Sequence, residues 1–270
     1  MTENNAMLIL ENVKKTFMPG TVNTKVALNG LSLTINKGDF ITVIGGNGAG
    51  KSTMLNAICG SFKIDSGRII LDGEDVTGVS EHKRAKDLGR VFQDPMLGTA
   101  AGMQIDENLA LAYRKGKKRT LKWGVKNNER AFYRKLLSEL DLGLEDRISS
   151  KVGLLSGGQR QAITLLMATL KQPKLLLLDE HTAALDPKTA EKVLAITDRI
   201  VSENNITTLM ITHNMKDAIA HGNRLIMLHE GKIIIDVCGE EKQKLTVEDL
   251  LAMFNKASGN EFVSDRAILS

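Results

Sequence analysis

The sequence predicts an α/β fold with a β-rich N-terminal quarter and an inserted helical segment. Short apolar stretches alternate with segments of helical periodicity, which is typical of a wound α/β core. Residues from about 106 to 170 show helical patterning and no convincing strand. The chain has 270 residues, of which 42% are hydrophobic and 25% charged. This composition is that of a globular protein long enough for one large domain or two small ones.

Seven strands are expected from short apolar runs that are bounded by turn-forming residues. They cover residues 8–13, 40–44, 68–71, 175–179, 207–211, 224–228 and 232–237. The last two are separated by three residues that include Gly231, which indicates a hairpin. Near the C-terminus, Thr246 is followed three residues later by Asp249 and then by an apolar run. That pattern predicts a capped helix that packs on the rest of the chain.

Composition excludes some classes of protein and leaves others open. The excess of 36 basic over 32 acidic residues, +4, does not by itself indicate a nucleic-acid partner. The isolated Cys59 and Cys238 give no disulfide framework or metal cluster, which favours a reducing compartment. No apolar run approaches the ~18 residues that span a bilayer, and no signal peptide is evident. We therefore expect a chain that reaches a membrane only by docking onto another protein.

A glycine-rich loop follows the strand at residues 40–44 and precedes a helix that Gly60 ends. It matches the P-loop (Walker A) pattern, in which backbone N–H groups and a helix N-terminus surround phosphates. Lys51 would reach the β- and γ-phosphates, and the Ser52 hydroxyl would hold Mg²⁺. A Rossmann site fits less well, because the glycine spacing differs and Lys51 would have no role. The candidate phosphate-binding residues are Gly45, Gly46, Asn47, Gly48, Ala49, Gly50, Lys51, Ser52 and Thr53.

Four consecutive leucines before Asp179 and Glu180 predict a strand buried on both faces. Asp179 would emerge at the carboxyl end of that strand, where ligands of open α/β sheets bind. In a P-loop ATPase this is the place of the aspartate that organises Mg²⁺. Glu180 would face the attacking water as general base. Alone, the two acids would favour a strand that ends in solvated carboxylates; beside a P-loop they favour the site.

The third motif runs from Leu155 to Gln159 and reads LSGGQ. Ser156 is placed to cap a helix whose apolar residues recur on one face. Capping does not require Gly157 and Gly158 as well. We interpret both glycines as allowing close approach of the backbone to an anion at the helix N-terminus.

These three motifs, in this order, resemble the ATP-binding subunit of an ABC (ATP-binding cassette) transporter. The resemblance runs from about residue 8 to residue 237. It implies a P-loop NTPase core of the ABC-ATPase type with an N-terminal antiparallel β subdomain. The implied ATPase domain covers residues 1–240, with a helical subdomain inserted at about 95–170 and a helical tail at 241–270. The implied cofactors are ATP and Mg²⁺.

The resemblance also assigns roles to four single residues. Phe17 would stack on adenine, Gln93 would meet Mg²⁺ and sense the permease, Asp186 would belong to the D-loop, and His213 would contact the γ-phosphate. Without the family, Phe17 reads as core, Gln93 as a surface amide and His213 as a core histidine. Asp186 before Pro187 also reads as a helix N-cap.

One residue departs from the family pattern. His181 stands after Glu180, where the family commonly has proline. A histidine there could titrate near neutral pH, but we favour a loop residue without a catalytic part. The run from Asp179 to Pro187 is similar to a subgroup associated with uptake of amino acids, often aromatic ones.

The resemblance implies partners as well. One P-loop and one LSGGQ motif predict a head-to-tail homodimer, or a heterodimer with a related chain, in which Ser156, Gly157, Gly158 and Gln159 of one copy cover ATP held by the other. The dimer would lie at the cytoplasmic face of the membrane on a transmembrane permease. An importer would add an extracellular substrate-binding protein. An exporter or lipid-extraction subunit is the alternative; a nucleic-acid-handling ATPase is less favoured, so no nucleic acid is expected.

A basic run at residues 114–119 holds five positive charges, with Trp123 and Tyr133 nearby. A solvated loop is the interpretation we favour. Proximity to anionic lipid comes next, and a nucleic-acid patch last.

Overall fold

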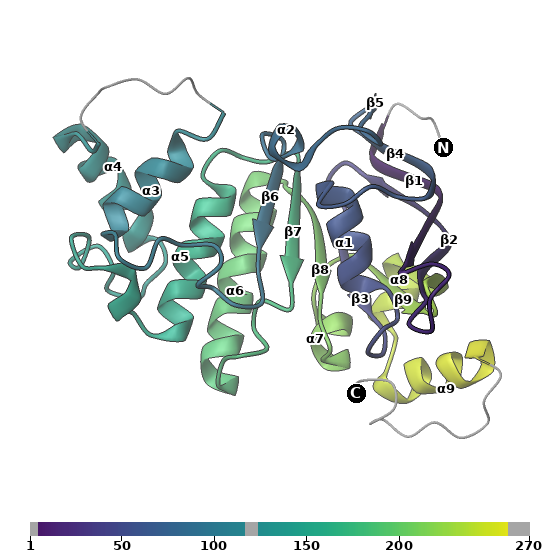
Figure 1. The fold of residues 1–270 in the computed structure, drawn as a ribbon. Helices are drawn as coiled ribbons and strands as arrows, with labels where there is room; N and C mark the ends of the chain where they lie inside the picture. The colour runs from purple at the N-terminus through teal and green to yellow at the C-terminus, as the bar shows by residue number, and fades with distance from the viewer. Residues whose placement is uncertain (1–4, 117–123, 259–270) are drawn as a thin grey trace.

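The computed structural model describes residues 5–116 and 124–258, which form two β-sheets with helices around them (Figure 1). The strands are β1 (Ala6–Phe17), β2 (Lys25–Asn36), β3 (Phe40–Ile44), β4 (Ser66–Leu71), β5 (Glu74–Asp75), β6 (Leu88–Val91), β7 (Leu175–Asp179), β8 (Thr207–Ile211), β9 (Arg224–His229) and β10 (Lys232–Cys238). The helices are α1 (Lys51–Cys59), α2 (Glu81–Arg84), α3 (Ile105–Tyr113), α4 (Asn127–Ser138), α5 (Gly157–Thr169), α6 (Pro187–Asn204), α7 (Met215–Ala220), α8 (Gly239–Gln243) and α9 (Val247–Ser258).

The larger sheet has six strands in the order β10-β9-β3-β8-β7-β6. Neighbours from β9 to β6 run parallel, and β10 pairs antiparallel with β9 as the expected hairpin. All five residues of β3 and of β8, and the four leucines of β7, are buried. Continuous apolar strands are what a sheet covered on both faces requires. The carboxyl ends of β3, β7 and β8 therefore lie at one edge, which positions the residues that follow them.

The smaller sheet has four antiparallel strands in the order β2-β1-β4-β5. All seven predicted strands exist, and the β-rich N-terminal quarter is confirmed. Three strands, β2, β5 and β6, were not predicted. In β2, Leu31, Leu33 and Ile35 alternate with more exposed residues, so the period-two signal of a half-buried strand is present. β6 has four residues, including Gly89 and Arg90, and is too short to show a period.

A helical part follows β6 and is formed by α3, α4 and α5. In the described residues between Asp106 and Leu170 there is helix and a 3₁₀ turn at Val152–Leu154, but no named strand, as predicted. Its apolar residues share a core with the outer face of the larger sheet, where Ile163 and Leu166 of α5 and Leu176 and Leu178 of β7 belong to one cluster. The helical part is thus packed onto the sheet and does not hold a core of its own.

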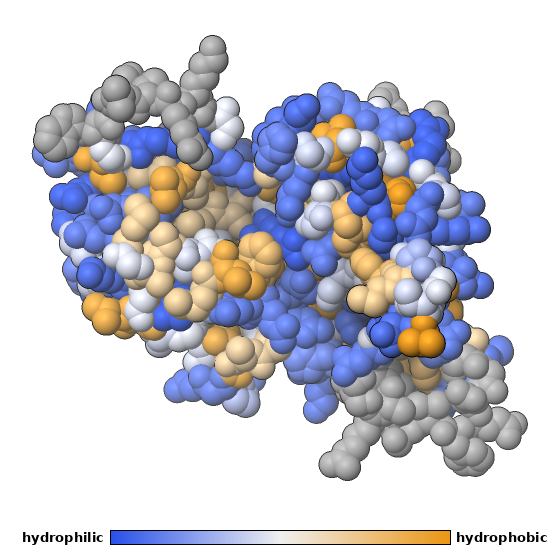
Figure 2. Space-filling model, viewed as in Figure 1, coloured by the Kyte–Doolittle hydropathy of each residue, from blue (hydrophilic) through white to orange (hydrophobic). Residues whose placement is uncertain are grey.

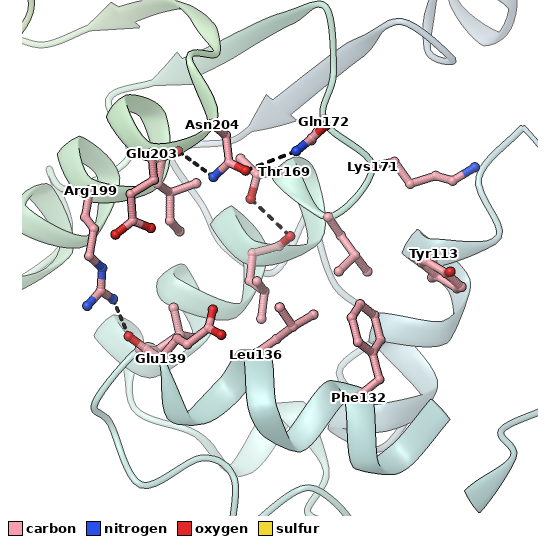
Figure 3. A pocket seen from close by; sticks show the side chains of 14 residues that line it. Tyr113, Phe132, Leu136, Glu139, Thr169, Lys171, Gln172, Arg199, Glu203 and Asn204 are labelled. Atoms are coloured by element: carbon pink, nitrogen blue, oxygen red, sulfur yellow. Dashed lines mark hydrogen bonds between the residues drawn. The ribbon is translucent and has the colours of Figure 1, made fainter. Parts of the chain in front are cut away.

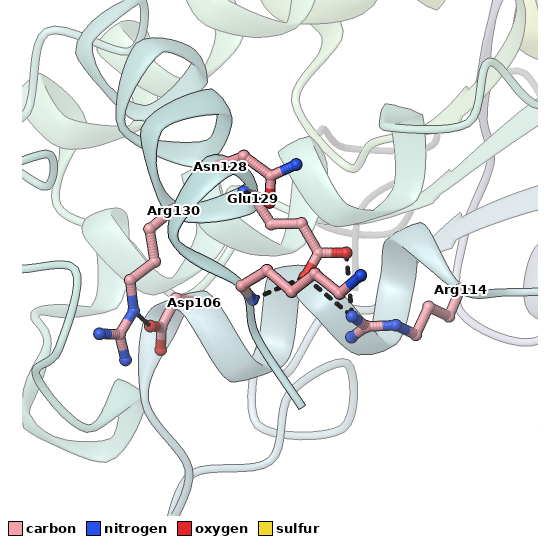
Figure 4. Close-up of polar contacts among 6 residues, drawn as sticks. Asp106, Arg114, Asn128, Glu129 and Arg130 are labelled. Atoms are coloured by element: carbon pink, nitrogen blue, oxygen red, sulfur yellow. Dashed lines mark hydrogen bonds and ion pairs between the residues drawn. The ribbon is translucent and has the colours of Figure 1, made fainter. Parts of the chain in front are cut away.

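Ion pairs hold α4 against α3, and they correct our interpretation of the basic run (Figure 4). Arg114 donates to both carboxylate oxygens of Glu129 at 2.9 Å, and Arg130 donates to the buried Asp106 at 2.7 Å. Lys115 Nζ donates to the carbonyl of Leu88 at 2.6 Å. Tyr133 is fully buried. Arg114 and Lys115 are therefore structural cations, and Tyr133 is not available for stacking on a base.

The remaining part of the run, Lys117, Lys118 and Arg119, lies outside the described residues, as does Trp123.

At the other end of the chain, Thr246 and Asp249 form the expected reciprocal cap, with backbone-to-side-chain distances of 2.9 and 3.1 Å. Leu250 and Phe254 of α9 are buried against the β9–β10 hairpin. Within the described residues, no helix is both long and apolar enough to span a bilayer.

Candidate nucleotide site

The P-loop connects the buried strand β3 to helix α1, which begins at Lys51 after Gly50. Gly45 has φ +148°, and a Cβ there would lie 2.3 Å from the backbone oxygen of Leu228. Gly50 has φ +104°, and a Cβ there would lie 2.6 Å from the carbonyl oxygen of Ala27. Side chains are excluded at both positions because the loop is pressed between β2 and β9. The glycines therefore fix the loop in place as well as allow its backbone to turn.

Lys51 lies inside this loop with 7% of its surface exposed. Its Nζ donates to the carbonyl oxygens of Gly45 at 2.5 Å and Gly46 at 3.3 Å. Burial lowers the pKa of Lys51, and the nearby carboxylates of Glu180 and Asp179 act in the opposite direction. The Lys51 ammonium is thus held in a fixed position beside the N-terminus of α1. A positive charge at a helix N-terminus suits the binding of a phosphate.

A pocket of about 370 Å³ surrounds the loop and combines residues from distant parts of the chain. Gln93 and Glu180 line it together with the predicted loop residues from Gly46 to Thr53. Lys25 and Ala27, from the unpredicted strand β2, line it too. Gln93 also borders a neighbouring pocket that contains Arg90 and Asp179. The structure therefore gathers the loop, Gln93 and the two acids around one edge of the sheet.

Asp179 and Glu180 occupy the end of β7 in different environments. Asp179 is half-buried, and burial raises its pKa against the opposing charge of Arg90, whose Nη2 lies 3.6 Å from Oδ2. Glu180 has φ +46°, an uncommon conformation for a residue with a side chain. Its N–H donates to the carbonyl of Ile211 in β8 at 3.1 Å. Glu180 Oε2 lies 3.9 Å from Nδ1 of His213.

Arg90 was not among the predicted site residues, although it lies three positions before Gln93. Besides facing Asp179, it donates to the side-chain oxygen of Asn56 in α1 at 2.8 Å and stacks 4.5 Å from the ring centre of Phe92. The only sequence signal was an arginine in a short apolar run, and that run was not recognised as a strand. His213 was predicted, and it follows β8 with 49% of its side chain exposed, so it is not a core histidine.

The LSGGQ motif begins helix α5, as predicted. Ser156 Oγ accepts from the N–H of Gln159 at 3.3 Å, and the Gln159 side chain accepts from the N–H of Ser156 at 3.2 Å. The structure adds a packing reason for one of the two glycines. A Cβ at Gly158 would lie 2.1 Å from Thr189 Cγ2 in α6, so this glycine is required by packing within the chain. Gly157 is exposed and Gly158 is buried, and their contact with an anion stays a prediction.

Several predicted residues do not line the pocket around the P-loop. Gly45, Asp179 and His213 lie next to residues that do. The others are Ser156 to Gln159, Asp186 and Phe17. Asp186 caps α6, accepting from the N–H of Thr189 at 3.1 Å, with Pro187 in the first turn. Phe17 is 37% exposed and packs edge-to-face on Phe62 at 5.5 Å. Phe17 is therefore not a core residue, and its proposed contact with adenine stays a prediction.

His181 points away from the pocket into the interior. It is 2% exposed, and its Nε2 lies 3.1 Å from Thr197 Oγ1 in α6. Burial lowers its pKa to about 4. Titration near neutral pH, one of the two interpretations we considered, is therefore wrong, and the imidazole is neutral under physiological conditions.

A second, larger pocket lies among α3, α4, α5 and α6 and holds about 790 Å³ (Figure 3). Phe132 and Leu136 of α4 lie on one wall. Arg199 of α6 donates to the carbonyl of Glu139, just after α4, and so connects the two helices at the edge of the pocket. None of the predicted site residues lines it. Size alone therefore does not identify the site with chemistry.

We expect Gly45→Ala to lower the free energy of unfolding by about 3 kcal/mol, because it adds backbone strain and a collision with the Leu228 backbone. Gly48→Ala is the matched control. Gly48 also has positive φ, +80°, but its Cβ would meet only the flexible end of Lys25, at 3.3 Å. Its expected cost is about 1 kcal/mol. Urea unfolding without nucleotide measures both; equal losses would show that the loop is not fixed against β9.

Comparison with known proteins places this geometry among ATP-binding proteins. The family model described as ABC transporter matches residues 28–183. A tyrosine transport ATP-binding protein of Clostridioides difficile is 48% identical over 251 residues, which are 93% of this chain and 100% of that protein. A methionine import ATP-binding protein of Rhizobium johnstonii is 35% identical over 228 residues, 83% of this chain but 59% of that protein.

Two solved structures are similar over most of the chain. An ATP-binding cassette of an ABC transporter in its ADP conformation has a TM-score of 0.74 at 29% identity and covers 92% of this chain and 98% of its own. A dimeric ATP-binding cassette in a post-hydrolysis state, bound to ADP and Pi, has a TM-score of 0.72 at 30% identity and covers 86% and 98%.

Proposed function

Because this chain belongs to the ABC transporter family of ATP-binding proteins and is an ATPase, we propose that it powers a separate transmembrane permease that imports amino acids. The name of the tyrosine transport relative favours an aromatic amino acid, and that of the methionine relative favours amino acids in general. Other relatives are named for spermidine and putrescine import. The names of the relatives therefore agree on transport but differ in the class of molecule transported.

The observation that carries the proposal is the pocket in which Lys51, Gln93 and Glu180 converge. A triphosphate in this pocket would accept bonds from loop N–H groups and from the Lys51 ammonium. Glu180, the residue beyond β7, would take the proton of the attacking water. His213, 3.9 Å from the Glu180 carboxylate, would donate to the γ-phosphate. Each group acts on charge that develops during phosphoryl transfer.

The donor set of the site fits Mg²⁺. Ser52, Gln93 and Asp179 offer a hydroxyl, an amide oxygen and a carboxylate, the hard oxygen ligands that Mg²⁺ prefers. In the described residues no cluster of three His, Cys, Asp or Glu side chains could hold a metal by itself. That suits an ion held by few protein ligands together with substrate phosphates. When bound, Mg²⁺ would neutralise charge on the β- and γ-phosphates.

The LSGGQ motif supports a dimer in the proposed function. Ser156 and Gly157 are exposed at the N-terminus of α5 and do not line the pocket of their own chain. A second copy, placed head to tail, would bring these donors to the outer side of the bound triphosphate. Asp186 would lie beside them, because its helix contacts Gly158 through Thr189. Loss of the γ-phosphate would remove these contacts and open the dimer.

Exposed apolar residues support a permease contact near Gln93. Met96, Leu97 and Leu154 are 42%, 70% and 72% exposed. On the face drawn in Figure 2, apolar side chains gather over the helical part, whereas hydrophilic ones cover much of the β-rich part. Such a patch on a helical layer suits a protein partner. The complex would lie at the cytoplasmic face of the membrane, with a substrate-binding protein outside the cell.

Uptake measurements test the proposal. Deleting the gene for this chain is expected to abolish energy-dependent uptake of labelled tyrosine, tryptophan or another amino acid and to leave spermidine uptake unchanged. Restoring the wild-type gene should restore uptake, and restoring Lys51→Ala should not. Unchanged uptake of every amino acid would overturn the import proposal, and slower efflux from preloaded cells would favour an exporter. Stimulation of the purified ATPase by DNA or RNA would favour a nucleic-acid function.

A further inference from the structure

We propose that His181 is a positioning residue for Glu180, acting through its hydrogen bond to Thr197. The inference rests on the proposed role of Glu180 as general base. His181 directly follows Glu180 at the end of β7, and Thr197 lies far along α6. Their bond of 3.1 Å joins the turn that carries Glu180 to the body of that helix.

The polarity of this bond follows from the hydroxyl of Thr197. Its single proton is given to the carbonyl of Val193 at 2.9 Å. Oγ1 can then only accept from the imidazole. His181 must therefore carry its proton on Nε2, which donates to Thr197. The contact is directional, and one tautomer of a neutral ring satisfies it.

The turn needs such an anchor because Glu180 is held in an unfavourable conformation. A side-chain residue at φ +46° costs about 1–3 kcal/mol and persists only where its surroundings impose it. On one side, the Glu180 N–H is tied to Ile211 of β8 at 3.1 Å. On the other side, His181 is tied to α6 and buried. These two bonds, on adjacent residues, set the direction in which the Glu180 carboxylate leaves the chain.

Thr197→Val tests the anchor, because it keeps the shape of the side chain and removes the acceptor. We expect kcat for ATP hydrolysis to fall about tenfold to hundredfold, as for a misplaced catalytic group, while the KM for ATP changes less than about twofold, because ATP contacts are untouched. Thr197→Ser retains the hydroxyl and should retain kcat. The matched control is Thr169→Val in α5, a buried threonine whose hydroxyl donates within its own helix, to the carbonyl of Leu165 at 2.9 Å.

A double variant separates positioning from general stability. In a Glu180→Gln background, adding Thr197→Val should lower the residual rate no further, because a residue that acts through Glu180 has nothing left to position. The inference would be overturned if Thr197→Val lowered the rate in the Glu180→Gln background by the same factor as in the wild-type background. Equal kcat values for Thr197→Val and Thr169→Val would overturn it too. Normal hydrolysis by Glu180→Gln would instead overturn the proposed base, so the two failures are distinguishable.

Thr197→Val leaves a buried N–H without a partner, which costs stability. His181→Leu combined with Thr197→Val removes both polar groups and should recover much of that stability. We expect its kcat to stay low, because the directional bond is still missing. Full recovery of kcat in the double variant would show that packing, and not the bond, positions Glu180.

Discussion

Lys51→Ala is expected to weaken ATP binding roughly tenfold to hundredfold, the value of one charge-assisted hydrogen bond. Hydrolysis should fall further, by about 10²- to 10³-fold in kcat, because the ammonium also faces charge that develops on the transferred phosphoryl group. The measurements are nucleotide titration and steady-state hydrolysis on the purified chain.

Lys242→Ala is the matched control for Lys51→Ala. Lys242 is also a buried lysine whose Nζ donates to two backbone carbonyls, those of His221 and Gly222. It lies in α8 and does not line the P-loop pocket. We expect a loss of stability from both variants, but a loss of ATP affinity only from Lys51→Ala. Normal hydrolysis by Lys51→Ala would remove the basis of the nucleotide site.

Glu180→Gln is expected to lower hydrolysis about 10²- to 10⁴-fold, the contribution of a positioned general base, and to leave ATP binding nearly unchanged. Since ATP then persists, an ATP-bound dimer should accumulate in gel filtration with light scattering. Glu230→Gln is the matched control, because Glu230 also has φ near +47° and follows a strand of the same sheet, but is exposed. A chain that stays monomeric with ATP would contradict the head-to-tail dimer.

Gly157→Glu, added to Glu180→Gln, tests which surface closes on the nucleotide. An acidic side chain in the first turn of α5 is favourable for the helix itself, and the new Cβ meets only Leu185 Cδ2, at 3.2 Å. The fold should tolerate it. A carboxylate facing a triphosphate would repel it, so we expect the ATP-dependent dimer to disappear. Persistence of that dimer would place its interface elsewhere.

Motifs that are formed by neighbouring residues of one segment could be predicted from the sequence. The strand–loop–helix of the P-loop, the cap at Ser156 and the cap at Asp186 are local, and their residue types specify them directly. The resemblance to an ATP-binding cassette is confirmed by the family match and by the solved structures. The roles of the individual site residues stay predictions.

Contacts between distant segments could not be predicted from the sequence. The LSGGQ motif carries no signal that Gly158 also packs against Thr189 of another helix. From the sequence, titration of His181 near neutral pH stays open as an alternative, but the burial that lowers its pKa comes from packing against α6. Arg114 and Lys115 read as a solvated run, but their partners are Glu129 and the backbone of Leu88. In each case the deciding atoms belong to another element.

Helix α6 has a consequence for communication between two ATP sites. Its 18 residues form a rod about 27 Å long. Near its start it lies against α5 at Thr189, and about halfway along it is bonded through Thr197 to His181, in the turn that carries Glu180. In the proposed dimer, the first contact faces the partner's nucleotide and the second serves the chain's own. A displacement of the helix at either site would be transmitted to the other, so the two hydrolysis events would not be independent.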